Sequence, residues 1–200
     1  GSGVAIGLPG NFGVVPGNEA ARLPAAQGLQ AIVSGSCSVA TNQQVMDFIK
    51  AGKPALAIDP LRIAAGVDVA AEALAWAEGH IGNGPVLVYS TAEPSAVRAI
   101  QGKLGSEKAG AMVEETIAAI ARGLVQRGVR QLIVAGGETS GACVQALGIT
   151  QMRIGAQIDP GVPWCHAVAP DARDGLHITL KSGNFGSTDF FTKAFAQLQA

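Results

Sequence analysis

The sequence predicts an α/β fold, with a mainly parallel doubly wound sheet and helices on both faces. Short apolar runs alternate with longer amphipathic stretches along the 200 residues. The runs are continuously apolar, which is typical of strands buried on both faces of a parallel sheet. Each intervening stretch is long enough for a helix, and regular alternation of strand and helix indicates parallel pairing.

Five strands are expected, in chain order, from short runs of mainly apolar residues. They lie at residues 31–33, 55–58, 86–89, 132–135 and 177–180. Aromatic residues make up only 4% of the chain, so the core between these strands and their helices is expected to consist of Ala, Val, Ile and Leu. A chain of this length buries enough surface to fold without disulfide staples.

Six helices are expected between and after these strands. Their predicted ranges are 41–51, 67–79, 94–101, 107–127, 140–147 and 189–198. The first carries Val45, Phe48 and Ile49 at helical spacing, and the longest carries an apolar stripe that includes Ile117 and Leu124. The range 94–101 opens with a proline at a first helical position, and the range 67–79 ends at a glycine.

Composition divides the chain into a short lead-in and one folded domain. Residues 1–27 are irregular and rich in Gly and Pro, and the domain is expected over residues 28–200. The net charge of −1 indicates no basic surface, which argues against a nucleic-acid partner. No apolar run approaches the length of a membrane span, and the first residues lack the basic start of a signal peptide.

The cysteines and histidines give no sign of a disulfide framework or a metal site. Cys37, Cys143 and Cys165 form an odd set without a CxxC pair, which favours free thiols in a reducing cytoplasm. The three histidines are far apart in sequence and share no ligand spacing, so structural or surface roles are expected for them.

The loops that follow the strands carry the strongest functional signal. In an open parallel sheet, ligands bind beyond the carboxyl ends of the strands. Four of the five loops there are small, hydroxyl-rich or Gly-rich; the five span residues 34–38, 59–60, 90–94, 136–141 and 181–186. Glycines let backbone amides approach an anion, a following helix adds further amide donors, and hydroxyls can bind phosphate or Mg²⁺. These loops therefore predict a phosphate site.

The loop Gly136–Gly141 is the sharpest of these signals, and two interpretations of it stay open. It is not a P-loop, because no Lys follows its last Gly, and it is not a dinucleotide GxGxxG. It could bind phosphate, or it could be a tight turn with Thr139 or Ser140 as helix N-cap. Glu138 could be an acid favoured near a helix N-terminus, or it could reach a metal or a ribose hydroxyl.

The other loops carry similar alternatives. Ser36 could contact a nucleotide, or the serines around it could cap the next helix. Lys181 is the one fixed cation in these loops, and it belongs either to a ligand clamp or to a plain turn in which it is solvated. Asp59 could serve Mg²⁺ or acid–base chemistry, or it could simply form an Asp-Pro turn.

Several of these segments together resemble the four-carbon acid sugar kinases. The stretch 134–141 is similar to the central motif of that family. Further matches, in order, are 1–9, 34–38 with Thr41 and Gln44, 158–164 and 180–186. The resemblance spans essentially the whole chain and matches the C-terminal, nucleotide-binding half of the family, whose N-terminal half binds the sugar acid.

The resemblance implies phosphorylation of 3-oxo-tetronates and related four-carbon sugar acids by ATP with Mg²⁺. Residues 1–27 would then be a lead-in from a sugar-binding domain, without which this chain is expected to be inactive. The implied nucleotide contacts are Ser36, Ser90, Gly136, Gly137, Glu138, Thr139, Lys181 and Gly183. No general base is assigned, and formation of a homo-oligomer stays open. The stretch 158–164 is expected to pack or close near the site, with a rigid turn at residues 160–163, although Trp164 could serve packing alone.

Two other functions compete with this hypothesis. A nicotinamide-dependent oxidoreductase on the same fold would need GxGxxG after the first strand, and Ser34-Gly35-Ser36-Cys37-Ser38 does not fit that pattern. A non-catalytic domain that senses a phosphorylated metabolite would share the same loops.

Overall fold

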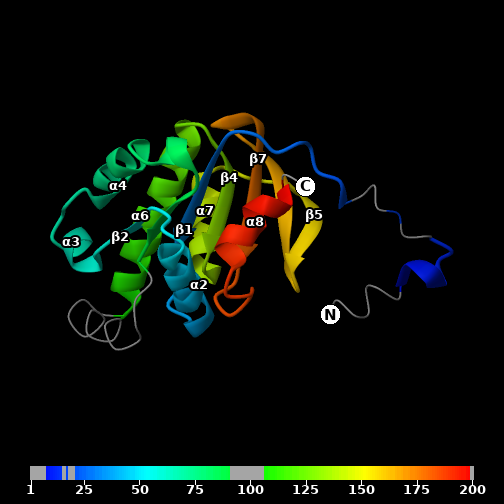
Figure 1. Ribbon diagram of the computed structural model, residues 1–200, viewed down its shortest axis with the longest axis horizontal. Helices are drawn as coiled ribbons and strands as arrows, with labels where there is room; N and C mark the ends of the chain where they lie inside the picture. The colour runs from blue at the N-terminus through cyan, green and yellow to red at the C-terminus, as the bar shows by residue number, and fades with distance from the viewer. Residues whose placement is uncertain (1–7, 15–16, 18–20, 91–105, 199–200) are drawn as a thin grey trace.

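A single seven-stranded sheet organises the chain in the computed structural model, which describes residues 8–14, 17, 21–90 and 106–198. The strand order is β2-β3-β1-β4-β7-β6-β5 (Figure 1). The strands are β1 (Leu29–Ser34), β2 (Ala55–Ala57), β3 (Val86–Tyr89), β4 (Val129–Ala135), β5 (Met152–Asp159), β6 (Val162–Ala169) and β7 (Ala172–Lys181).

The predicted α/β class and all five predicted strands are confirmed. Strands β2, β3, β1, β4 and β7 pair in parallel. Two strands were missed: β6 pairs antiparallel with both β7 and β5. The turn expected over residues 160–163 is shorter than predicted, because only Pro160 and Gly161 lie between β5 and β6.

Helices cover both faces of the sheet. They are α2 (Val39–Lys50), α3 (Pro60–Ala64), α4 (Val69–Glu78), η2 (Ile81–Asn83), α6 (Ser106–Gln126), α7 (Gly137–Ala146) and α8 (Phe190–Leu198). The helix expected over 94–101 lies outside the described residues. The helix expected over 67–79 starts two residues later than predicted, because Asp68 caps α4 and Val69 is its first residue. The short helix α3, which precedes α4, was not predicted.

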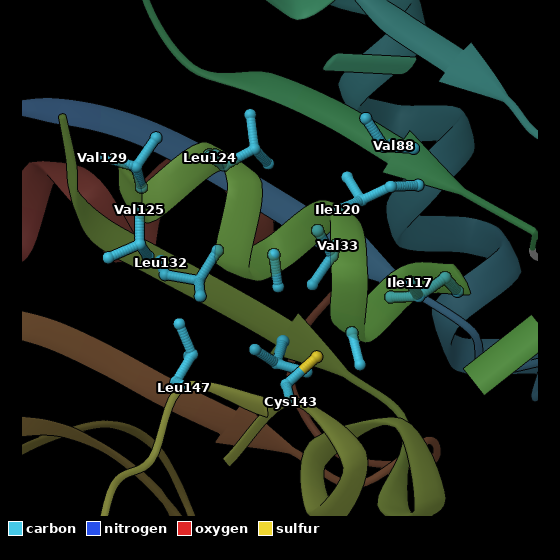
Figure 2. Packing of buried hydrophobic residues seen from close by; sticks show 14 of the residues in the cluster. Val33, Val88, Ile117, Ile120, Leu124, Val125, Val129, Leu132, Cys143 and Leu147 are labelled. Carbon is cyan, nitrogen blue, oxygen red and sulfur yellow. The ribbon is translucent and has the colours of Figure 1, made fainter. Parts of the chain in front are cut away.

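Alternation along the strands divides the core into two layers. Ala31 and Val33 of β1 face a layer built with α4, α6 and α7, whereas Ile32 faces the layer built with α2 and α8. Figure 2 shows the first layer, in which Ile120 and Leu124 of α6 lie over the sheet. The second layer holds the larger aromatic side chains, including Phe48 of α2 and Phe191 of α8, whose rings meet edge to face. Burial on both faces explains the continuous apolar runs.

None of the described helices is both long and apolar enough to cross a membrane. The three cysteines are free thiols, as expected. Within the lead-in, residues 8–11 form a helical turn that lies beyond the β5 edge of the sheet (Figure 1). The later part of the lead-in packs on the domain, because Leu23 lies against Gly155 of β5.

Candidate functional site

The last residues of four parallel strands lie side by side along the edge of the sheet formed by the carboxyl ends of its strands. Ser34 of β1 is in register with Tyr89 of β3 and Ala135 of β4, and Ala135 is in register with Lys181 of β7. The loops that follow begin at the same height, and backbone hydrogen bonds tie them to one another: Gly35 N donates to Ala135 O, at 3.0 Å, and Gly136 N donates to Lys181 O, at 2.8 Å. This edge, called the rim below, is where the loops were predicted to converge.

Ser36 lies between two glycines at the rim. A β-carbon on Gly136 would stand 3.3 Å from Ser36 N and 2.6 Å from Thr139 Oγ1. A β-carbon on Gly183 would stand 2.6 Å from Ser36 Oγ. Gly136 also has φ +128°, a conformation that side chains rarely adopt. The structure thus brings together the segments of β1, β4 and β7 through contacts that only glycine permits.

The segment Gly136–Gly141 is not a loop, because α7 starts directly after Gly136. Gly136 is the N-cap and its successor Gly137 is the first helical residue, so the alternative with Thr139 or Ser140 as N-cap was wrong. Ser140 instead donates from its Oγ back to Gly136 O, at 2.5 Å. No side chain caps the helix, and a β-carbon on Gly137 would meet nothing within 4 Å. An uncapped helix start in open space suits an anion.

Glu138 lies in the first turn of α7 and faces Glu114 of α6. The pKa of Glu114 is raised, first by burial and then by a hydrogen bond to Glu138 and the charge of that carboxylate. A bound cation would stabilise the ionised form of Glu114. The described residues include no cluster of three or more His, Cys, Asp or Glu that could hold a metal by itself.

Lys181 is buried, so the alternative of a solvated lysine was wrong. Its side chain has no exposed surface. The Nζ donates to Thr41 Oγ1 at 2.9 Å, to Gly183 O at 3.1 Å and to Ser182 O at 3.3 Å. Burial lowers its pKa from 10.5 to about 8. The ammonium group therefore lies beneath the loop that follows β7 rather than in solvent above it.

One face of α2 holds the same loop in place. Ser38 caps α2 by accepting from Thr41 N, which confirms the capping role considered for these serines. Ser38 Oγ and Thr41 Oγ1 both donate to Gly183 O. Gln44 Nε2 lies within 3.1 Å of three successive carbonyl oxygens, those of residues 185, 186 and 187. Ser38, Thr41 and Gln44 are three positions apart, which is the only sign in the sequence that they share one face of α2. That spacing did not indicate that they bind the loop after β7.

The remaining candidates lie at the margins of this cluster. Ser90 is buried and its N donates to Ser34 O at 2.9 Å, while the rest of its loop lies outside the described residues. Asp59 caps α3 by accepting from Leu61 N, which supports its structural interpretation. His166 and His177 do meet, with ring centroids 5.0 Å apart on neighbouring strands. His177 Nε2 lies 3.0 Å from Pro24 O, so this pair contacts the lead-in rather than the rim.

The hairpin between β5 and β6 contacts the loop after β7. A β-carbon on Gly161 would stand 3.0 Å from the ring of Phe185. Asp159 accepts from Ser187 N at 2.8 Å and from Lys193 Nζ at 2.5 Å, which ties the hairpin to the start of α8. The predicted packing of 158–164 near the site therefore holds, although the segment is mostly strand.

The chain matches a known family over most of its length. A family profile described as a nucleotide-binding C-terminal domain matches residues 31–191. A 3-oxo-tetronate kinase of Cupriavidus necator is 52% identical over 202 residues, which cover 99% of this chain and 46% of that protein. A 3-oxo-tetronate kinase of Pseudomonas fluorescens is 50% identical, with coverage of 99% and 46%. The chain thus spans about half the length of these curated relatives.

Solved structures share the fold. Haemophilus influenzae protein HI1011 superposes with a TM-score of 0.81 at 37% sequence identity, covering 88% of this chain and 42% of that one. A Salmonella typhimurium LT2 structure superposes with a TM-score of 0.83 at 36% identity, covering 98% and 46%.

Proposed function

Since this chain belongs to the nucleotide-binding C-terminal domain family, we propose that it binds ATP for phosphorylation of a four-carbon sugar acid of the 3-oxo-tetronate type. The observation that carries this proposal is the meeting of Ser36 with Gly136 and Gly183 at the rim. Three loops approach one another there without side chains between them. Such a glycine-lined edge, with an uncapped helix start beside it, suits the phosphates of a nucleotide.

The proposed contacts are distributed around that edge. Backbone amides of Gly137 and Gly183 and the hydroxyls of Ser36 and Thr139 would donate to the phosphates. Gly136, whose own amide is bonded to Lys181 O, would line the edge beside them. Ser90 at the end of β3 and Glu138 in the first turn of α7 flank them. Lys181 adds a positive charge from below.

The proposed reaction is a direct phosphoryl transfer. A hydroxyl oxygen of the sugar acid forms a bond to the γ-phosphorus, the bond from that phosphorus to the bridging oxygen of ADP breaks, and the hydroxyl proton leaves to a base or to water. Transfers of this kind depend on alignment and on stabilising the charge of the phosphoryl oxygens. Amide donors fixed by the sheet edge require no rearrangement as that charge develops.

Mg²⁺ fits the carboxylate pair beside this edge. The ion is usually held by one or two carboxylates together with substrate phosphates. Glu138 and Glu114 supply such a pair, and the pKa of Glu114 is raised first by burial and then by Glu138. When bound, Mg²⁺ would neutralise phosphate charge.

The sugar acid is proposed to be bound by a separate domain that precedes this one in the full-length protein. The curated kinases are about twice as long as the matched region, which covers 46% of the Cupriavidus necator protein. This chain would therefore supply the nucleotide and need that domain for turnover. We expect a cytoplasmic protein, with neither nucleic acid nor membrane as partner.

Calorimetric titration tests the proposal. Mg·ATP should bind this chain, or the full-length protein with both halves, and NAD⁺ should not. Full-length protein should also form ADP when a four-carbon sugar acid is supplied with ATP. Binding of NAD⁺ alone would favour the oxidoreductase, and ATP binding by the full-length protein without turnover of any tetronate would favour a sensor.

A further inference from the structure

Lys181 is a buried cation without an anionic partner in the described part of the chain. Its three hydrogen-bond acceptors are all neutral: the hydroxyl of Thr41 and the carbonyls of Ser182 and Gly183. Lysine is rarely fully buried unless it is paired with a carboxylate. The side chain nonetheless has no exposed surface. A group that costs stability in this way calls for a functional explanation.

Peptide geometry shows what this lysine does to the loop. In a trans peptide unit the carbonyl and the next amide point in opposite directions. Lys181 draws the carbonyls of Ser182 and Gly183 toward itself, so the amides of Gly183 and Asn184 point away from it. Neither amide has an acceptor among the described residues. Two successive outward amides form the kind of concave donor site that binds anions.

Gln44 donates in the same way to the carbonyls of the next part of the loop, residues 185–187. Its Nε2 lies 3.0 Å from the carbonyls of residues 185 and 187 and 3.1 Å from that of Gly186. Gln44 is itself buried, and its Oε1 has no hydrogen-bond partner. The side chain is thus committed to donating toward the loop. Together, Lys181 and Gln44 donate to five inward carbonyls of residues 182–187. The hydroxyls of α2 also donate to Gly183 O, and Phe185 N also donates to Ser182 O.

We propose that Lys181 is a positioning residue of the nucleotide site, which turns the loop carbonyls inward so that the amides of Gly183 and Asn184 face a phosphate of ATP. Its charge also attracts that phosphate through the loop, without direct contact. This inference rests on the proposed function and adds a role for Lys181 to it. The contact of Gly183 with Ser36 places these amides beside the amides of β4 and α7.

The absence of a carboxylate has a measurable consequence. Burial alone lowers the Lys181 pKa to about 8, and no charged group of α2, β4, β6 or the loop contributes among the described residues. A phosphate above the loop would favour the charged form of the lysine and raise its pKa again. Nucleotide binding should therefore be accompanied by proton uptake between about pH 8 and pH 10.5.

The test compares Lys181→Met with Lys50→Met, a control that removes an exposed lysine at the end of α2. Titration of the full-length protein with Mg·ATP at pH 7 should give at least about tenfold weaker binding for Lys181→Met and unchanged binding for Lys50→Met. The melting temperature of Lys181→Met should be equal to or above that of the wild type, because a buried unpaired charge is removed.

A second readout uses the wild type. Titrations above pH 8 in buffers of different ionisation enthalpy should report proton uptake on binding, which Lys181→Met should lose. Unchanged ATP affinity in Lys181→Met, no proton uptake by the wild type, or joint loss of binding and thermal stability would each overturn the inference. A wild type that binds no Mg·ATP would overturn the proposed function as well, which separates the two failures.

Discussion

Ser36 and Gly183 face each other across the rim so closely that a β-carbon on Gly183 would stand 2.6 Å from Ser36 Oγ. These residues are 147 positions apart in sequence and follow different strands, β1 and β7. Their contact depends on a glycine at position 183, and it places the loop after β7 against the loop after β1. If a nucleotide binds at this edge, the contact should control its affinity.

Gly183→Ala should weaken Mg·ATP binding by about tenfold or more, equal to roughly 1.4 kcal/mol. The added methyl group would displace Ser36 or the loop, and the amides around them would no longer converge. Gly82→Ala serves as the control, because a β-carbon there meets nothing within 4 Å. Equal affinities of the two variants in a calorimetric titration would remove the Ser36–Gly183 contact from the site.

Gly137→Asp should abolish nucleotide binding while the fold stays intact. The position is the first residue of α7 and its β-carbon would lie in open space, so the side chain can be accommodated. A carboxylate in the first turn stabilises a helix but repels phosphate. Circular dichroism and thermal melting should match the wild type, and so should those of Gly82→Asp. Retained ATP affinity in Gly137→Asp would exclude the start of α7 from the site.

Lys181→Met should change how stability depends on pH. The folded-state pKa of Lys181, about 8, lies below the ordinary 10.5, so between these values the unfolded chain binds more protons. The cost of burying the charge is therefore fully present below pH 8 and is relieved as pH rises toward 10.5. Its size is on the order of 3 kcal/mol.

Denaturant unfolding measured between pH 7 and pH 10 should show that the unfolding free energy of the wild type rises relative to that of Lys181→Met as the pH rises. The comparison cancels contributions from the other titratable groups. A constant difference in unfolding free energy across this range would mean that Lys181 does not titrate there.

Much of the sheet could be predicted because its central strands are buried on both faces. Val33, Val88 and Ile133 lie in unbroken apolar runs, and Ile178 lies in a buried run between His177 and Thr179. Strand β5 gave no such signal, since Arg153, Gly155 and Gln157 interrupt it and most of its side chains are half-buried or exposed. As an edge strand it needs no continuous apolar run, and its pairing with β6 is visible only in three dimensions.

The convergence of the loops at the rim was predicted, but not its detail. Strand ends of a parallel sheet meet at one edge, which is why Ser36, Gly136 and Gly183 could be grouped from sequence. The start of α7 was misplaced because glycine is a poor helix former, whereas Gly137 is the first helical residue in the structure. The burial of Lys181 could not be predicted, because lysine at a strand end is normally exposed.

Glu138→Gln should weaken binding of Mg·ATP by about tenfold and leave binding of metal-free ATP unchanged. The substitution removes one carboxylate from the proposed cation site. It should also lower the pKa of Glu114 part of the way toward its ordinary value, since burial would still raise it. Glu115→Gln, at an exposed position next along α6, is the matched control.

Parallel titrations with and without Mg²⁺ measure the first effect, and carboxyl chemical shifts across an acid titration measure the second. Equal loss of affinity for both forms of ATP would assign Glu138 to the nucleotide itself rather than to the cation.

The central claim is that the rim formed by β1, β4 and β7 binds ATP. The most direct test is calorimetric titration of the full-length protein with Mg·ATP, with NAD⁺ as the control ligand and Gly137→Asp as the control variant. We expect saturable binding of Mg·ATP to the wild type, no binding of NAD⁺, and no binding of Mg·ATP to Gly137→Asp. Binding of NAD⁺, or of Mg·ATP equally to both proteins, would contradict it.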